Sequence, residues 1–417
     1  KPEVMDKLDR RLIQLKIERE AVRKEQDEAS QKRMALIEEE ITKLQKDYAD
    51  LEDVWKSEKA QAQGENPADV KAAEKMAKLF DLLRENNPAI SAQEIHSQNV
   101  FLSRILFCYF AEDTGIFEPN LFTNHLASHT ALDGTDLCDY LSRVFDVMNQ
   151  EHRKNLPDYL TDFPYVNGGL FADKLPVPKF NRKSRAMLIE CGSDLNWSEI
   201  NPDIFGSMIQ AVVDPSQRGN LGMHYTSVPN IMKVIEPLFL NDLKEEFENT
   251  IGNEKKLREL LHRISKIKLF DPACGSGNFL IIAYKELRRL EMLILKELGG
   301  FAFSGIHLNN FYGIELDDFA HEIAKLSLWL AEHQMNVEFF NEFGRTNPTL
   351  PLQEAGQIVC GNACRLDWEK VCPKNDGDEI YILGNPPYLG SSLLSSFQKE
   401  DVSIVFGKIS GSNNLDY

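Results

Sequence analysis

The sequence feature that most constrains the fold is a strand-like run that passes through a glycine-rich turn into a helix. The run KIKLFDPA (266–273) is apolar enough for a buried strand, and residues 277–298 have the apolar spacing of a helix. The joining stretch FDPACGSGNF (270–279) contains Gly275 and Gly277. Glycines at this position permit a tight turn and let a ligand approach the backbone closely. An ordinary structural turn also uses glycine, so the stretch alone is weak evidence for a binding site.

The same strand pattern recurs later in the chain. NFYGIEL (310–316) is predicted to be a strand and residues 317–334 a helix, and GQIVCGN (356–362) and EIYILGN (379–385) are predicted to be further strands. Alternating strands and helices predict an α/β fold whose parallel sheet has helices on both faces. Ligands of such sheets bind beyond the carboxyl ends of the strands. Unusual residues at those ends are therefore candidates for ligand binding.

Polar residues stand at three of these ends: Asp271, Glu315 and Asn362. A carboxylate at the position of Glu315 can accept hydrogen bonds from both hydroxyls of a ribose. A solvated acid at the end of a strand is the alternative interpretation. Asn362 can hydrogen-bond a nucleoside base or can form a turn, and the sequence does not separate these two roles.

The fourth strand ends in GNPPY (384–388). Asn385 offers a side-chain carbonyl, and the prolines that follow have no N–H, so this stretch of backbone presents acceptors in a fixed path. Two converging acceptors can orient an exocyclic NH2 group and stabilise the positive charge that develops when its nitrogen attacks an electrophile. Tyr388 can stack on the flat ring that carries the amine. A proline-rich turn that merely ends a strand is the alternative.

Length and composition limit the number of domains and the kinds of binding site that the chain can have. A chain of 417 residues predicts two or three domains. No apolar run reaches the ~20 residues of a membrane span, and seven cysteines without framework spacing suit a reducing cytoplasm. For Cys360, Cys364 and Cys372 we favour free thiols over a zinc site, because a fourth ligand is not obvious. The net charge of −18 argues against nucleic-acid binding over the whole chain, but leaves room for a local basic groove.

Residues 1–64 differ from the rest of the chain. They are rich in charge and contain two series of apolar residues at 3-4 spacing that are out of phase across EQDEASQKR. This pattern predicts a coiled coil, either two helices folded as a hairpin or one helix with a stutter. Residues 65–200 are predicted to form a mainly helical domain, in which Ser91 and Glu94 fit a capping box. A third domain, with the sheet, is expected over 201–417.

Taken together, these elements resemble a known family. GMHYTS (222–227), DPACGSGNF and NPPY occur in the order found in class I S-adenosylmethionine-dependent methyltransferases, and FLSRILFCYFAEDTGIF (101–117) resembles a helical spacer. Over about 66–417 the chain resembles the N6-adenine DNA methyltransferases of the MmeI-like restriction-modification group. The resemblance implies a Rossmann-like sheet, S-adenosyl-L-methionine as cofactor, and double-stranded DNA with a flipped adenine as partner, in a bacterial restriction-modification or phage-defence system.

The resemblance also implies roles for individual residues. The methionine part of the cofactor would be held by His224, Tyr225, Thr226, Asp271, Pro272, Ala273, Gly275, Gly277 and Phe279. Glu315 would bind the ribose, and Asn362 the cofactor's adenine. The flipped adenine would be received by the catalytic residues Asn385, Pro386, Pro387 and Tyr388. No metal is implied, because the sulfonium is already activated.

The two ends of the chain depart from this family. The sequence stops at GSNNLDY, which resembles the start of the family's next motif, so the sheet is expected to be C-terminally incomplete and a target-recognition domain is not expected. Residues 1–64 resemble the middle-domain coiled coil of ClpB disaggregases, which implies a possible chaperone contact. No phosphate loop accompanies them, so an ATPase is not implied. Two alternatives remain: a protein glutamine methyltransferase, which also uses an NPPY clamp, and a non-catalytic coiled-coil interaction fusion.

Overall fold

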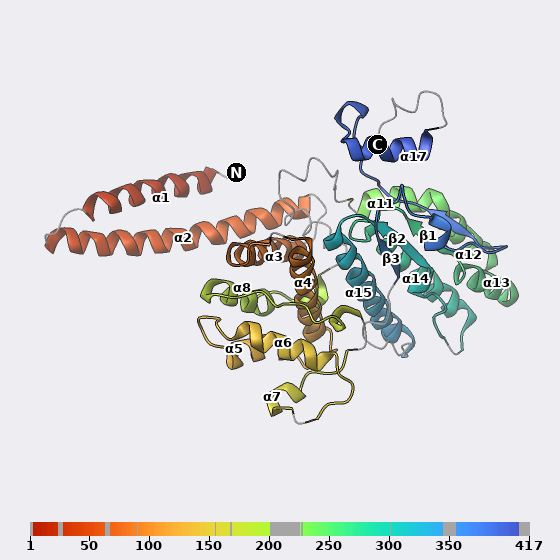
Figure 1. The fold of residues 1–417 in the computed structure, drawn as a ribbon, viewed down its shortest axis with the longest axis horizontal. Helices are drawn as coiled ribbons and strands as arrows, with labels where there is room; N and C mark the ends of the chain where they lie inside the picture. The colour runs from red at the N-terminus through yellow and green to blue at the C-terminus, as the bar shows by residue number, and fades with distance from the viewer. Residues whose placement is uncertain are drawn as a thin grey trace. The chain divides into compact units, whose positions relative to one another are not determined.

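The computed structural model describes residues 3–23, 28–62, 67–89, 91–154, 156–166, 169–200, 226, 228–300, 302–344 and 356–407. The chain divides into two compact units, Lys1–Lys71 and Ala72–Tyr417 (Figure 1).

The first unit contains two long helices, α1 (Glu3–Val22) and α2 (Glu28–Ala62), which lie side by side (Figure 1). Their apolar seam is formed by Leu12, Leu15, Ile37 and Ile41, with Val22, Leu44 and Tyr48 packed against it. Of the two arrangements that the sequence left open, the structure has two separate helices rather than one helix with a stutter.

Ion pairs between α1 and α2 show that the two helices are antiparallel. Arg11 pairs with Glu40 at 2.8 Å. Arg33, nearer the start of α2, pairs with Glu18, nearer the end of α1, at 2.5 Å. Later residues of α1 therefore pair with earlier residues of α2. These exposed pairs specify the register and add little stability.

The second unit begins with a helical region, as the sequence predicts for the spacer. Its helices are α3 (Pro67–Asn86, which begins within the first unit), α4 (Ala92–Asp113), α5 (Leu121–His129), α6 (Leu137–Met148), α7 (Asp158–Thr161) and α8 (Arg182–Ser193), with the 3-10 turns η1 (Gly169–Phe171) and η2 (Trp197–Glu199). The predicted capping box is confirmed: the Ser91 hydroxyl accepts a hydrogen bond from Glu94 N, and the Glu94 carboxylate accepts one from Ser91 N. Because α4 is buried around most of its circumference, it forms the centre of the spacer core.

The α/β region follows. Its elements are α11 (Val228–Ile235), the π-helical segment η4 (Glu236–Leu240), α12 (Asn241–Thr250), α13 (Glu254–Ile264), β1 (Lys268–Asp271), α14 (Asn278–Leu298), η5 (Leu308–Asn310), β2 (Phe311–Glu315), α15 (Asp318–Phe343), β3 (Gln357–Cys360), α16 (Trp368–Val371), β4 (Ile380–Ile382), η6 (Ser391–Leu393) and α17 (Ser396–Phe406). The four strands form one parallel sheet in the order β3-β2-β1-β4. The predicted parallel α/β fold is confirmed. The domain boundary expected near residue 200 adjoins residues 201–225, outside the described part, and stays a prediction.

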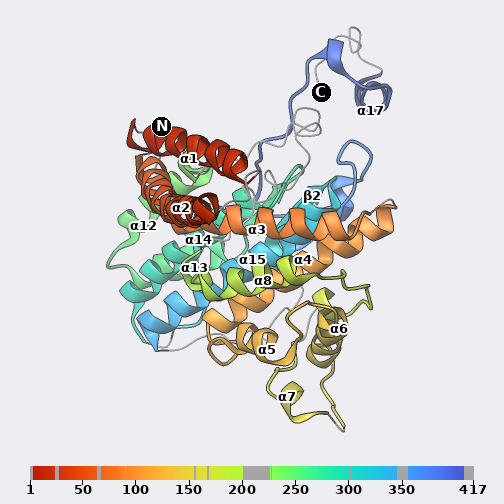
Figure 2. The same cartoon turned by 90° about the vertical axis from the view of Figure 1, so that its left-hand side faces the viewer.

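Successive side chains of each strand serve opposite faces of the sheet. Leu269 and Phe311 join a large core with α11–α15, whereas Phe270 and Tyr312 join a smaller core on the other face, beside α16. Figures 1 and 2 show α14 and α15 running together beside the sheet. Helix α14 connects β1 to β2, and α15 connects β2 to β3. Both crossovers therefore join neighbouring parallel strands, as the alternating sequence predicts.

Helix α15 belongs to two cores at once. One side packs on α14 and the sheet, and the other side packs on α4 of the spacer. Phe319 stacks on Phe80 with ring centroids 6.3 Å apart, and Trp329 meets Phe107 at 5.5 Å. Helix α15 therefore joins the spacer core to the sheet core, because it contributes side chains to both. Among the described residues, no helix has the length and apolarity to cross a membrane.

Candidate cofactor and substrate site

The glycine loop and the NPPY segment meet because of the register between β1 and β4. Phe270 pairs with Ile382, and Leu383 N donates to Phe270 O at 3.0 Å. Asp271 is the last residue of β1, and Gly384 follows Leu383 just beyond the end of β4, where its backbone lies against the Asp271 carboxyl group. Both stand at the carboxyl edge of the sheet, where ligands of parallel sheets bind.

An open hollow of about 630 Å³ lies at this edge. Its walls bring together two predicted motifs, the start of the glycine loop and the start of the NPPY segment, and a third element from η4 and the end of α11. The lining residues are Asp271, Pro272, Ala273, Ile382, Leu383, Gly384, Pro386, Val234, Pro237 and Leu238. Candidate residues for the cofactor and for the amine are thus gathered around one space.

Asp271 presents an unsatisfied oxygen at this edge. Its side chain is 1% exposed. Oδ1 accepts a hydrogen bond from Ala273 N at 3.0 Å, whereas Oδ2 is buried and has no hydrogen-bond partner among the described residues. Burial, with a smaller contribution from Glu315, raises the pKa of Asp271 to about 7. A buried carboxyl oxygen without a partner is costly in a folded protein, so this oxygen is suited to a cationic or N–H group of a ligand.

Glu315 connects the loop after β1 to the turn after β2. Its Oε2 accepts from Gly275 N at 2.8 Å, and its Oε1 accepts from Asp317 N at 2.8 Å. Burial raises the pKa of this carboxyl group. The backbone of Leu316 also contacts this carboxyl group, and since its two oxygens have four lone-pair directions, Glu315 keeps acceptor capacity for a ligand hydroxyl. The predicted ribose contact fits this geometry and stays a prediction.

The two loop glycines adopt conformations that other residues disfavour. Gly275 has φ +55° and Gly277 has φ +85°. Gly277 also packs on Ala324 of α15, where a β-carbon would lie 3.5 Å from the alanine side chain. Phe279, a predicted cofactor residue, is 5% exposed within the sheet core, so its described contacts are with the protein interior.

The NPPY residues are exposed, and Pro386 among them lines the hollow. Asn385 Nδ2 donates to Thr226 Oγ1 at 3.0 Å, which leaves the Asn385 side-chain carbonyl as its acceptor. Pro387 is exposed, and Tyr388 is 74% exposed. Thr226, which was expected at the cofactor, therefore contacts Asn385, which was expected at the amine, and both roles stay predictions. His224 and Tyr225 lie outside the described residues.

Asn362 follows β3 and makes contacts that the sequence did not indicate. Its Oδ1 accepts from Cys364 N at 2.8 Å, and its Nδ2 donates to Asp401 of α17 at 2.8 Å. Arg365 also pairs with Asp401, at 2.6 Å, and Asp401 is fully buried. The turn role that was left open for Asn362 is therefore present, and the base-binding role stays a prediction.

Other residues of the hollow were missed from the sequence. Val234, Pro237 and Leu238 reach it from α11 and η4. The sequence signal that could have revealed them was Pro237 inside an otherwise helical run. Proline lacks the N–H that a regular helix needs, and π-helical segments often accompany functional sites. All seven cysteines are free thiols, and within the described ranges no three His, Cys, Asp or Glu side chains gather as metal ligands would.

Two regions of the chain match known protein families. Residues 247–417 match the family model described as MmeI, DNA-methyltransferase domain, and residues 96–171 match MmeI, helicase spacer domain. The chain carries MmeI-like spacer and DNA-methyltransferase domains. The helical spacer and the parallel sheet described above are the structures of these two MmeI-like domains.

Individual relatives agree with this assignment. DNA methyltransferase A of Bacillus subtilis (strain 168) is 52% identical over 377 residues, which are 89% of this chain and 43% of that protein. The solved structure of the Type IIL restriction-modification enzyme MmeI in complex with DNA matches 83% of this chain and 47% of its own, with a TM-score of 0.76 and 41% identity. The chain therefore spans less than half the length of these relatives.

The first unit has relatives of a different kind. The chaperone protein ClpB of Dichelobacter nodosus is 62% identical over 60 residues, which are 14% of this chain and 7% of that protein. The similarity to ClpB noted for residues 1–64 is confirmed, and it covers a small part of both proteins.

Proposed function

We propose that this chain binds S-adenosyl-L-methionine at the carboxyl edge of its sheet and transfers the methyl group to the N6 amine of an adenine flipped out of double-stranded DNA. The observation that carries the proposal is the shared hollow, because Asp271 and Gly384 lie side by side in the lining of one space. A methyl donor and an amine must be in contact for transfer, and this hollow is lined by the candidate residues for both.

The cofactor side is supported by the carboxyl groups and the glycines. The unpartnered Oδ2 of Asp271 would accept from the ammonium of the cofactor's methionine part. Gly275 and Gly277 would let the cofactor approach the backbone, and Glu315 would accept from the ribose hydroxyls with its remaining lone pairs. When bound, S-adenosyl-L-methionine supplies a methyl group already activated by its sulfonium, so the protein supplies position and electrostatics.

The proposed binding of the amine is supported by hydrogen-bond acceptors that are already held in place before substrate binds. The Asn385 carbonyl and the backbone carbonyl of Pro386 would accept from the two hydrogens of the adenine amine, leaving the nitrogen lone pair toward the methyl group. Thr226 holds the Asn385 amide by accepting from Nδ2, and this contact orients the carbonyl. Positive charge that develops on the nitrogen is stabilised by these fixed dipoles. Tyr388, which is largely exposed, would stack on the purine.

The MmeI-like domain match favours DNA over the alternative substrate, the glutamine side chain of a protein. The NPPY segment by itself could bind either the amide of a glutamine side chain or the aromatic amine of adenine. The choice between these two substrates therefore depends on the rest of the domain. The relatives named above include a restriction-modification enzyme solved with DNA, and we infer the same setting for this chain.

The test is methyl transfer followed by identification of the product. The chain is incubated with S-adenosyl-L-methionine carrying a labelled methyl group and either unmethylated genomic DNA or a glutamine-containing peptide. Nucleosides and amino acids from complete digests are then separated. Label in N6-methyl-2′-deoxyadenosine supports the proposal. Label in a methylated cytosine or in methylglutamine would contradict it.

A further inference from the structure

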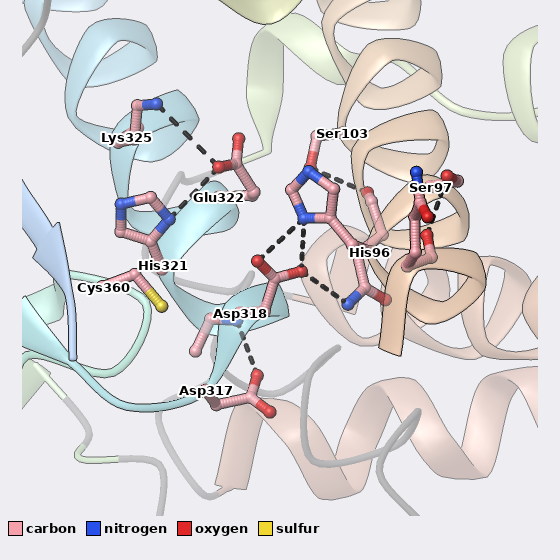
Figure 3. A network of polar contacts seen from close by, with 12 residues as sticks. His96, Ser97, Ser103, Asp317, Asp318, His321, Glu322, Lys325 and Cys360 are labelled. Carbon is pink, nitrogen blue, oxygen red and sulfur yellow. Dashed lines mark hydrogen bonds and ion pairs between the residues drawn. The ribbon is translucent and has the colours of Figure 1, made fainter. Parts of the chain in front are cut away.

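The spacer contacts the α/β region through a polar cluster beside the cofactor edge (Figure 3). His96, on α4, places Nδ1 2.8 Å from both carboxyl oxygens of Asp318, the first residue of α15. Asn99, one turn farther along α4, donates from Nδ2 to Asp318 Oδ2 at 3.2 Å. Since carboxylate oxygens only accept, His96 Nδ1 carries the hydrogen of this contact.

Asp318 belongs to a short backbone segment that ends at the cofactor candidate Glu315. The preceding residue, Asp317, is the N-cap of α15 and accepts from Ala320 N through Oδ1 at 2.8 Å. The backbone N–H of the same Asp317 donates to Glu315 Oε1 at 2.8 Å. The other oxygen of Glu315 accepts from Gly275 N. One continuous set of contacts thus runs from the spacer helix to the glycine loop.

The physical properties of this contact favour a role in positioning over a role in stability. The side chains of His96 and Asp318 are each 37% exposed, and ion pairs or hydrogen bonds at such positions add little to folding free energy. Spacer and α15 are already held together by buried aromatic contacts such as Phe80 on Phe319. The polar contact instead fixes the direction of the first turn of α15, to which Glu315 is tied.

We propose that His96 and Asn99 of the spacer are positioning residues for the cofactor's ribose. By holding Asp318, they fix the turn from Glu315 to Asp318, so that the free lone pairs of Glu315 point toward the ribose hydroxyls. This inference rests on the proposed function. It gives the spacer a direct part in cofactor binding, through a path in which neither spacer residue touches the cofactor.

The experiment measures the affinity of the whole chain for S-adenosylhomocysteine and for its 2′-deoxyribose analogue by calorimetry. His96→Ala removes the donor, and His96→Asn restores an N–H donor near the position of Nδ1. For His96→Ala we expect about a 5- to 10-fold loss of affinity for S-adenosylhomocysteine, the size of one hydrogen bond's contribution. The loss should be about twofold or less for the deoxy analogue, and His96→Asn should recover most of the lost affinity.

Two further variants separate positioning from packing. Phe80→Leu weakens an apolar contact at the same junction, so it should lower the melting temperature without distinguishing the two ligands. In the double variant His96→Ala with Asp318→Ala, the losses should be non-additive, because both substitutions break one contact.

Each other result has a defined meaning. If the wild-type chain does not bind S-adenosylhomocysteine, the proposed function itself fails. If the wild-type chain binds but His96→Ala keeps full affinity, or loses equal affinity for both ligands, the positioning role is overturned and the proposed function stands.

Discussion

The backbone of Gly384 lies against the carboxyl group of Asp271, so closely that a β-carbon at position 384 would be 2.4 Å from Asp271 Oδ1 and 2.9 Å from Cγ. Gly384 is the first residue of GNPPY, and Asp271 is the last residue of β1. The segment proposed to bind the amine and the residue proposed to bind the cofactor are therefore in direct contact. A shift of either one must move the other.

Gly384→Ala should disturb both halves of the site. The methyl group cannot fit beside the buried carboxyl group, so either Asp271 or the NPPY segment must shift. We expect a stability loss of about 1–3 kcal/mol, typical of overpacking, and at least about a tenfold loss of affinity for S-adenosylhomocysteine. Chemical denaturation and calorimetry measure the two effects.

Gly377→Ala is the matched control for this substitution. Gly377 has φ +83°, so alanine there carries backbone strain, but a β-carbon would meet no atom within 4 Å. Its variant should lose some stability and keep full affinity for S-adenosylhomocysteine. Equal affinity losses in both variants would show that glycine substitution acts through general destabilisation.

Cofactor affinity should depend on pH through Asp271. Burial raises the pKa of this carboxyl group to about 7, and a ligand ammonium favours the ionised form. Affinity for S-adenosylhomocysteine should therefore increase by about tenfold from pH 6 to pH 8, because the ionised fraction of the free protein increases by that factor. Asp271→Asn should bind more weakly and show a much flatter profile. A profile of unchanged steepness in that variant would assign the titration to another group.

Binding is a better measurement than melting for this purpose. A raised carboxyl pKa means that the folded chain keeps its proton to about pH 7, whereas the unfolded chain loses it near its ordinary value of 3.8, so stability falls as the pH rises between these values. Glu112 in the spacer core also has a pKa raised to about 7 by burial. The titrations of the two groups would overlap in a melting experiment, but Glu112 is not part of the proposed cofactor site.

Asn385→Ala should separate chemistry from cofactor binding. The substitution removes an acceptor for the amine and the contact with Thr226, but leaves Asp271 and Glu315 unchanged. We expect methyl transfer to fall by about 100-fold, as for the loss of one fixed dipole in other active sites, with affinity for S-adenosylhomocysteine within about twofold of wild type. Loss of cofactor binding in this variant would show that Asn385 contributes to the cofactor pocket, contrary to the proposed role at the amine.

The antiparallel pair α1 and α2 should be dispensable for the cofactor site. It has its own apolar seam, and the second unit has separate cores. Removal of residues 1–62 should therefore leave affinity for S-adenosylhomocysteine unchanged, while any binding of a chaperone partner is lost. A drop in affinity after this deletion would contradict the division of roles.

The sheet was the most predictable part of the structure. Strands β1 to β4 and helix α14 were expected within a few residues of their observed bounds, because apolar runs and periodic spacing are local signals. Helix α15 extends to Phe343, beyond the expected end at residue 334. Its extra turns bury Phe339 against Leu295 and Ala302, a tertiary contact that local periodicity does not reveal.

The sequence singled out candidate motifs but not their contacts. Asp271 ends one strand and Asn385 follows another, and both stand in stretches rich in glycine or proline, which made them candidates. The sequence could not indicate that Asn362 is held by Asp401, or that His96 of a separate helical region reaches Asp318. Such pairs join residues far apart in the chain, and only the packed fold brings them together.

The central claim is that the edge formed by Asp271, Gly275 and Glu315 is a binding site for S-adenosyl-L-methionine. Calorimetric titration of the folded chain with S-adenosylhomocysteine tests it most directly. We predict saturable binding at one site per chain, abolished or strongly weakened in Glu315→Ala at a retained circular-dichroism spectrum. A folded wild-type chain that binds no S-adenosylhomocysteine at millimolar concentrations would contradict the claim.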